Sequence, residues 1–231
     1  MTPSPRRRLP GEVLLAGAML AALAVLGALV AWTAGVPRLD DHVRGWVLAH
    51  QAGPLRDVLS GVTHLGDAGL VIPLFLALAG YLSWFRRTAE PLVLALSGSG
   101  LLALSVGVGK ALLGRQGPSR EPAAFLSGAW PSGHTATATV VYLLLACLLT
   151  QQFPEHRAGY GRYAVPALLG LPGLVAAALV YCDYHWLSDV VGGLLLGVPV
   201  AIAAQLLTRR LLRSRRFVLP PARPTASQNR S

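Results

Sequence analysis

Three polar segments interrupt an otherwise apolar chain, and each holds residue types that can handle phosphate. The first surrounds Lys110, the only lysine, within "SVGVGKALLG". The second is "WPSGHTATAT" (130–139), and the third is "CDYHWLSDVVGG" (182–193). Charged side chains are costly to insert at membrane depth, so their presence in apolar segments indicates function. A lysine is a compact cation that suits phosphate. Taken alone, Lys110 could equally be a lysine whose side chain snorkels to the lipid headgroups.

The third segment pairs a histidine with a carboxylate. His185 and Asp189 are four residues apart, a spacing that places both on one face of a helix. A carboxylate that accepts the imidazole Nδ1–H fixes the tautomer and raises the basicity of Nε2, which suits a nucleophile or a base. The alternative is an interfacial pair that only caps a helix.

The second segment favours an anion site. Ser132 is a preferred residue for capping the helix that follows, and Gly133 lets a ligand approach the first-turn N–H groups. His134 adds a titratable proton beside them. An ordinary serine cap with an incidental histidine is the alternative for this segment alone. Taken together, the three segments supply a cation, an N–H cradle and two histidines, which is a set for phosphoryl transfer.

These residues resemble the type-2 phosphatidic acid phosphatase superfamily, which includes membrane lipid phosphatases and shares its core with vanadium haloperoxidases. Its pattern runs Lys, six residues, Arg-Pro; then Pro-Ser-Gly-His; then Ser-Arg, five residues, His, three residues, Asp. "PSGH" is intact at 131–134, and Lys110 and "HWLSD" (185–189) have the family's order and spacing.

The resemblance implies a role for each matching residue. His185 is the nucleophile that forms a phosphohistidine, Asp189 orients it, and His134 protonates the leaving group and then activates water. Lys110, Ser132 and the backbone N–H of Gly133 hold the phosphoryl oxygens. The resemblance implies no metal and no other cofactor.

Two arginines of the family pattern are absent. The Arg-Pro position reads Gly117-Pro118, and the Ser-Arg position reads Ala178-Leu179. Each lost charge-assisted hydrogen bond is worth about 1.5–3 kcal/mol, so two unreplaced losses would slow the reaction strongly. Arg115 and Arg120 are the nearby candidates to restore phosphate-binding charge.

Membrane-spanning helices must position these residues. The chain is 53% hydrophobic and 13% charged, with a mean hydropathy of +0.53. Apolar runs of about 18 residues or more indicate spans, and six are present at 13–36, 68–85, 91–113, 135–152, 163–182 and 186–208. We expect an all-α, polytopic, six-transmembrane-helix bundle. The first run exceeds the apolar part of a signal peptide and indicates a retained anchor, with a cleaved signal as the alternative.

Positive charges set the orientation, because they favour the cytoplasmic side of short loops. Fourteen arginines flank one side of the predicted spans, whereas the other side has five arginines and Lys110. Both termini are therefore expected in the cytoplasm, and 37–67, 114–134 and 183–185 outside. All three polar segments then open on the extracytoplasmic face of the cell membrane.

The net charge of +10 follows from the same pattern. Because the charges flank spans without interleaved aromatics, they indicate contact with anionic lipid headgroups and not with nucleic acid. Residues 1–10 and 217–231 are expected to be disordered, and we divide the chain into a cytoplasmic N-terminus (1–10), a membrane domain (11–210) and a basic cytoplasmic tail (211–231). Cys147 and Cys182 are expected to be free thiols without metal-ligand neighbours.

The predicted function is hydrolysis of a lipid phosphate at the outer leaflet, with membrane lipids as surroundings. Phosphatidate, lysophosphatidate and isoprenyl (di)phosphates all fit. Two alternatives stay open: a lipid phosphotransferase, which passes the group to an alcohol, and a degenerate member that binds or moves phospholipid without hydrolysis. The oligomeric state stays open as well.

Overall fold

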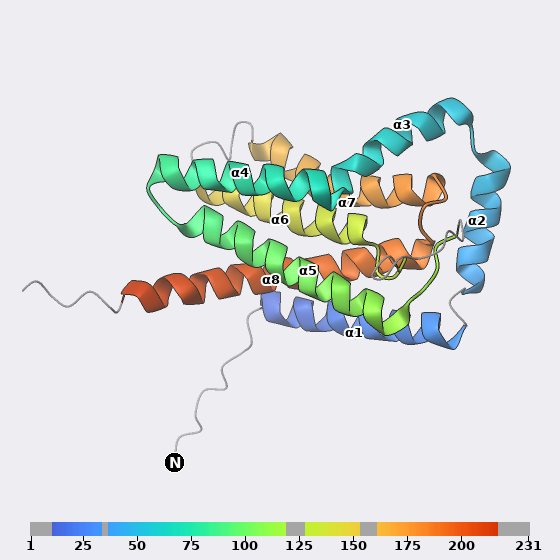
Figure 1. Cartoon of the computed structure of the whole chain (residues 1–231), viewed down its shortest axis with the longest axis horizontal. Helices are drawn as coiled ribbons and strands as arrows, with labels where there is room; N and C mark the ends of the chain where they lie inside the picture. Colours follow the sequence, from blue (N-terminus) through green and yellow to red (C-terminus); the bar gives the residue numbers. More distant parts are fainter. Residues whose placement is uncertain (1–10, 34–36, 119–127, 153–160, 217–231) are drawn as a thin grey trace, which may run out of the picture.

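The six predicted spans form six long helices in the computed structural model, which describes residues 11–33, 37–118, 128–152 and 161–216. Within these residues, six helices are long and apolar enough to cross a membrane. They are α1 (Gly11–Trp32), α4 (Ala68–Arg86), α5 (Glu90–Leu113), α6 (Gly133–Gln152), α7 (Gly161–Tyr181) and α8 (Leu187–Arg216). They run alongside one another in Figure 1. The predicted all-α, six-span architecture is confirmed.

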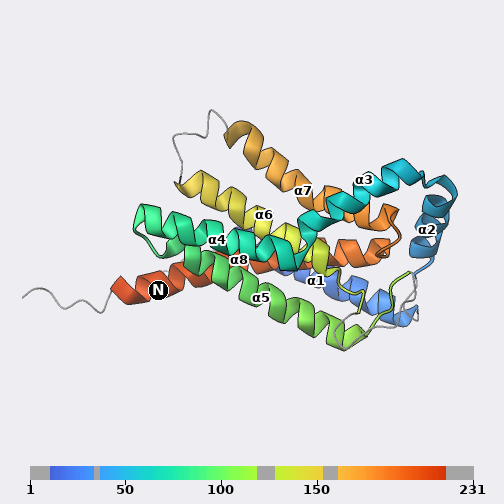
Figure 2. The same cartoon turned by 45° about the horizontal axis from the view of Figure 1, so that its top comes forward.

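Shorter helices connect α1 to α4, where only an outward segment was predicted. They are α2 (Arg38–His50), α3 (Gly53–Thr63) and a 3-10 turn, η1 (His64–Gly66). Both views place α2 across one end of the bundle, with α3 leading back toward α4 (Figures 1 and 2). One face of α2 buries Asp40 and Val47, while Trp46 stays exposed. Helices this short and amphipathic do not stand out in a search for long apolar runs.

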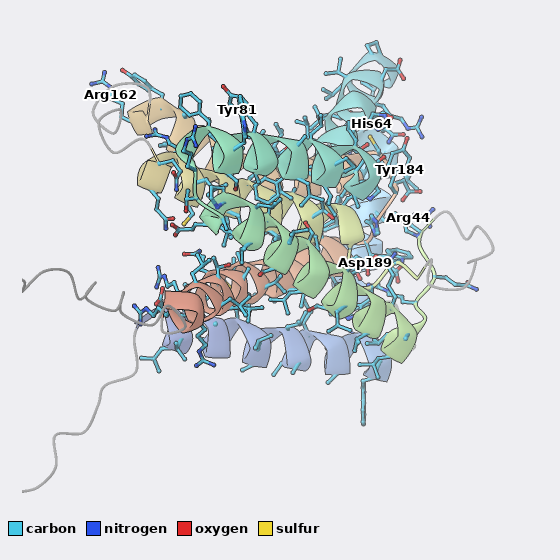
Figure 3. All side chains as sticks on the ribbon, turned by 60° about the vertical axis from the view of Figure 1, so that its left-hand side comes forward. Arg44, His64, Tyr81, Arg162, Tyr184 and Asp189 are labelled. Carbon is cyan, nitrogen blue, oxygen red and sulfur yellow. The ribbon has the colours of Figure 1, made fainter. Side chains whose placement is uncertain are left out.

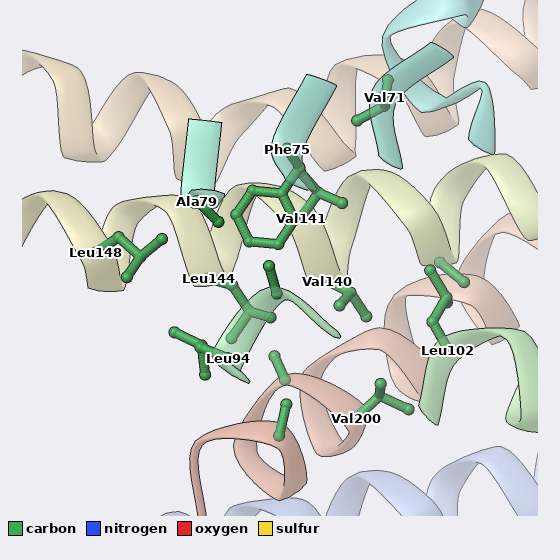
Figure 4. Close-up of a cluster of buried hydrophobic side chains, with 14 of the residues drawn as sticks. Val71, Phe75, Ala79, Leu94, Leu102, Val140, Val141, Leu144, Leu148 and Val200 are labelled. Carbon is green, nitrogen blue, oxygen red and sulfur yellow. The ribbon is translucent and has the colours of Figure 1, made fainter. Parts of the chain in front are cut away.

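The central helix of the bundle is α6, the most buried of the six spans. Its apolar side chains meet those of α4, α5 and α8 in one cluster (Figure 4). The contributors include Phe75, Leu94, Leu102, Val140, Leu144, Leu148 and Val200. A second cluster joins α6, α7 and α8 around Tyr142, Leu179 and Val190. The first turns of α6 and α8, which hold two of the polar segments, are therefore fixed against each other.

Glycine lets α8 approach α6 closely at that point. A Cβ at Gly193 would lie 2.7 Å from the carbonyl oxygen of Ser132 and 2.8 Å from Cβ of Thr135. Small residues at such crossings allow helix backbones in membranes to come near each other. The "PSGH" segment is therefore packed directly against the helix that carries Asp189.

The largest differences from the predicted spans are at the ends of α1 and α8. α1 ends at Trp32, whereas its span was predicted to residue 36. α8 continues to Arg216, whereas its span was predicted to end at residue 208, so the predicted domain boundary at 210 falls inside a helix. Leu211 and Leu212 prolong the helix there although arginines surround them.

Cys147 and Cys182 are free thiols. Residues 1–10 and 217–231, predicted to be disordered, lie outside the described residues.

Candidate active site

His185 lies in the turn between α7 and α8. The turn is closed by backbone hydrogen bonds from Tyr184 N and His185 N to the Leu179 carbonyl, at 3.0 and 3.4 Å. Asp183 adopts a left-handed conformation with φ of 60°, which reverses the chain after α7. α8 then begins at Leu187. The turn thus places the His185 ring at the end of the bundle.

Asp189 lies in the first turn of α8 and is completely buried. Its Oδ2 is 3.4 Å from Nδ1 of His185 and accepts a hydrogen bond from Trp186 N at 3.1 Å. The two side chains meet as their spacing predicted, although His185 precedes the helix instead of sharing a face of it. They meet because the Asp189 carboxylate folds back over the start of α8. This contact uses Nδ1 of His185, so the other ring nitrogen, Nε2, is the one that can act on a substrate.

Ser132 caps α6. Its Oγ accepts hydrogen bonds from Thr135 N at 3.4 Å and from the Thr135 hydroxyl at 3.2 Å, and the residue is fully buried. Gly133 begins the helix, so its N–H has no intrahelical acceptor. His134 follows, and its ring centroid lies 6.4 Å from that of His185 with the planes at 60°. The start of α6 therefore offers N–H donors and an imidazole beside His185.

Direct contacts bring the three polar segments together. A Cβ at Gly109, next to Lys110, would lie 2.5 Å from Cδ of Pro131. Ser132 N donates a hydrogen bond to the Asp189 carbonyl at 3.0 Å. The first segment thus adjoins the second, and the second adjoins the third.

Lys110 is half-buried in the last turn of α5. Among the described residues, its ammonium group has no hydrogen-bond or ion-pair partner. Asp189 is near enough to interact with it electrostatically. An unpaired cation close enough to act electrostatically on Asp189 and His134 is suited to an anionic ligand.

Arg115, expected to add charge for phosphate, is instead enclosed by carboxylates. Its side chain is 2% exposed. Nη1 donates to Asp189 Oδ1 at 2.5 Å and to Ser188 Oγ at 2.6 Å, and Nη2 donates to Asp40 Oδ2 at 2.6 Å. Arg120, the other candidate, lies outside the described residues.

The two positions without the family arginines differ in their surroundings. Among the described residues, a Cβ at Gly117 would meet the Tyr184 carbonyl oxygen at 3.7 Å and Cβ of Ala129 at 4.0 Å, which are ordinary contacts beside the His185 turn. Leu179 is 1% exposed and belongs to the second apolar cluster. Position 117 thus accepts a Cβ without a close contact to the described residues, whereas position 179 is filled by core packing.

Two residues of α2, Asp40 and Arg44, also reach this end of the bundle. Arg44 donates to both carboxylate oxygens of Asp183, at 2.8 and 2.9 Å, and its guanidinium lies 5.5 Å from the ring centre of Trp186. The hydrogen bond with Asp183 raises the pKa of Arg44 above its ordinary value. Figure 3 shows Arg44, His64, Tyr184 and Asp189 at one end, and Arg162 at the other.

Sequence reasoning did not single out Asp40, Arg44 or Ser188. The only signal for the first two is their spacing of four residues within an outer segment. In a sequence, a buried aspartate at such a position looks the same as a solvated one. Within the described part of the chain, no group of three or more His, Cys, Asp or Glu residues is arranged to hold a metal ion.

Comparisons with known proteins point to one family. Residues 91–213, which include all three polar segments, match the model of the PAP2 superfamily. Phosphatidylglycerophosphatase B of Bacillus subtilis (strain 168) is 30% identical over 148 residues, covering 62% of this chain and 70% of that protein. A crystal structure of a transmembrane PAP2-type phosphatidylglycerolphosphate phosphatase from Bacillus subtilis has a TM-score of 0.71 and 23% identity, covering 90% of this chain and 98% of that chain. At 23% identity, the match to this crystal structure shows a similarity of fold.

Proposed function

The chain belongs to the PAP2 superfamily and is a membrane lipid phosphatase, and from this premise we propose that it removes the phosphate of a lipid phosphomonoester through a phosphohistidine at His185. One observation carries the proposal. Nδ1 of His185 lies 3.4 Å from the buried Asp189 carboxylate, and a second imidazole, that of His134, has its ring centre 6.4 Å away. This arrangement provides a nucleophile with a fixed tautomer and a separate acid–base group.

In the first step, Nε2 of His185 attacks phosphorus. A phosphorus–nitrogen bond forms while the bond between phosphorus and the lipid oxygen breaks. His134 donates its proton to that oxygen, so the lipid leaves as an alcohol. Asp189 stabilises the positive charge on the His185 ring by accepting its Nδ1–H.

In the second step, water attacks the phosphohistidine. His134, now neutral, takes a proton from the water as its oxygen bonds to phosphorus. The phosphorus–nitrogen bond breaks, its electron pair returns to Nε2 of His185, and inorganic phosphate leaves. The Lys110 ammonium and the first-turn N–H groups of α6, fixed by the Ser132 cap, hold the phosphoryl oxygens throughout.

The site opens on the outer membrane face in this proposal, because the fourteen-to-six distribution of positive residues favours cytoplasmic termini. For the substrate, we propose a glycerophospholipid phosphomonoester of the phosphatidylglycerophosphate type. Its support is the 30% identity to a phosphatidylglycerophosphatase B.

Phosphate release by the purified full chain tests the proposal. The panel is phosphatidylglycerophosphate, phosphatidate, lysophosphatidate and an isoprenyl diphosphate, each in mixed micelles. We expect the first lipid to give the highest kcat/KM and His185→Ala to abolish release. Wild-type protein no more active than His185→Ala on every lipid would contradict the proposed hydrolysis.

A further inference from the structure

Arg115 is held in a buried network of alternating charge. Its guanidinium bridges Asp40 of α2 and Asp189 of α8, with nitrogen–oxygen distances of 2.6 and 2.5 Å. Asp40 is 2% exposed and also accepts hydrogen bonds from Ser188 N at 2.8 Å and the Ser188 hydroxyl at 2.5 Å. One guanidinium therefore joins two carboxylates that come from distant parts of the chain.

The two carboxylate oxygens of Asp189 have different partners. Oδ1 accepts from Arg115, whereas Oδ2 faces Nδ1 of His185 and accepts from Trp186 N. With Oδ1 fixed by the guanidinium, rotation of the carboxylate about its own axis is restrained. Oδ2 is then kept on the side of the reacting histidine.

The Trp186 ring contributes to the same arrangement. Arg115 lies 5.4 Å from the ring centre, and the indole N–H donates to the Gln116 carbonyl at 3.0 Å. A guanidinium near an aromatic face gains cation–π attraction, most strongly where water is excluded. The residue directly after His185 is thus tied to the segment that carries Arg115.

We propose that Arg115 is a positioning residue for the reaction: together with its counter-ion Asp40, it holds Asp189 in the orientation that activates His185. This inference rests on the proposed function, in which His185 is the nucleophile. The guanidinium does not touch the substrate. Asp40 couples the outer helix α2 to the catalytic turn, because the guanidinium that fixes Asp189 is itself fixed by Asp40.

A role as phosphate ligand makes opposite predictions. To reach phosphate, Arg115 would have to leave two buried carboxylates, and Asp40 would then compete with the substrate for the guanidinium. Neutralising Asp40 would strengthen phosphate binding if Arg115 were a ligand. If Arg115 positions Asp189, neutralising Asp40 weakens catalysis and leaves phosphate binding unchanged.

The test measures kcat, KM and the inhibition constant of inorganic phosphate for Arg115→Met, Arg115→Lys and Asp40→Asn. Folded protein is quantified by size-exclusion chromatography and circular dichroism in detergent, and kcat is expressed per folded active site. A loss of folded protein is thereby separated from a slower rate per site without relying on the phosphohistidine itself. Arg56→Met, at an exposed arginine of α3, is the matched control. We expect kcat per site to fall about tenfold or more in Arg115→Met and severalfold in Asp40→Asn, with KM and phosphate inhibition within about twofold of wild type.

Arg115→Lys separates the two roles even if Arg115→Met does not fold. A lysine keeps the charge but lacks the planar fork, so it cannot serve both carboxylates. We expect it to stay near the low kcat of Arg115→Met, whereas a phosphate ligand would be largely replaced by lysine. Unchanged kcat per site, or weaker phosphate inhibition that lysine restores, overturns the inference. Wild-type activity equal to that of His185→Ala would instead reject the proposed function.

Discussion

Arg44 of α2 and Asp183 of the α7–α8 turn form a bidentate ion pair, with Nε–Oδ1 at 2.8 Å and Nη2–Oδ2 at 2.9 Å. Asp183 is the left-handed residue that reverses the chain two positions before His185. The pair is partly open to solvent, since the two side chains are 33% and 20% exposed. α2 therefore holds the turn from outside, in addition to its buried contact through Asp40.

Breaking this pair should have a small and salt-dependent effect. Partly exposed pairs contribute about 0.2–1 kcal/mol, so we expect Arg44→Met and Asp183→Asn each to lower kcat/KM by up to about fivefold. Asparagine tolerates the left-handed conformation, so the backbone is kept. The two effects should not add in the double variant, and they should shrink at 1 M salt. Additive losses would show that the two residues act separately. Arg56→Met, at an exposed arginine of α3 outside the pair, is the control.

The two histidines should differ in the step that each controls. We expect His185→Ala to abolish phosphoenzyme trapped under alkaline denaturing conditions, in which a phosphohistidine is stable, on any substrate. His134→Ala should slow turnover with a lipid phosphate yet still form phosphoenzyme with a p-nitrophenyl-type ester, because a low-pKa leaving group needs no acid catalyst. Rapid quench into alkaline detergent, with substrates labelled in the phosphoryl group, measures both. Phosphate attached to His134 in wild-type protein would reverse the assigned roles.

Labelling of an engineered cysteine tests the membrane orientation. Ser119→Cys is placed in a chain whose native Cys147 and Cys182 are replaced, and intact cells are treated with an impermeant maleimide. Because the positive charges favour cytoplasmic termini, we expect labelling without permeabilisation. A cysteine added at residue 228 in the tail is the control and should label only after permeabilisation. The reverse pattern would put the active site on the cytoplasmic side.

The long spans and the phosphatase family were predictable because both depend on local patterns. Apolar runs mark the helices, and "PSGH" with its two partner segments marks the family. The spacing of His185 and Asp189 also anticipated their contact. The network around Arg115 was not predictable, because its partner Asp40 lies 75 residues away in a short helix that no apolar run reveals. Whether a charge is buried depends on tertiary packing that the sequence pattern does not show.

Gly193 should be intolerant of even one methyl group. Its added Cβ would meet the Ser132 carbonyl oxygen and Thr135 within 2.8 Å, which are backbone and first-turn atoms that cannot move aside easily. We expect Gly193→Ala to cost about 1–3 kcal/mol and to lower kcat by displacing α8 from the start of α6. Gly100→Ala is the control, because a Cβ there would meet none of the described residues within 4 Å; it should leave stability and kcat unchanged. Thermal unfolding in detergent and kcat together check the prediction.

An arginine introduced at position 117 should strengthen phosphate binding, whereas an arginine introduced at position 179 should not. Gly117 does not have a positive φ, so an L side chain fits its backbone, and within the described part of the chain its added Cβ would make ordinary contacts beside the His185 turn. We expect Gly117→Arg to raise kcat/KM for a dianionic phosphomonoester about tenfold, as one charge-assisted contact is regained. Gly117→Gln, similar in length but uncharged, should not do so.

Leu179→Arg is the contrasting variant, because it puts a charge among the buried side chains of Tyr142 and Val190. An unpaired buried charge costs several kcal/mol, so we expect loss of folded protein and no gain in kcat/KM. Leu179→Met, which keeps the apolar volume, should fold normally. Both predictions follow from a phosphate site that has fewer cations than a dianionic phosphate requires. A Gly117→Arg variant that is no better than Gly117→Gln would show that Lys110 and the α6 N–H groups already neutralise the phosphate.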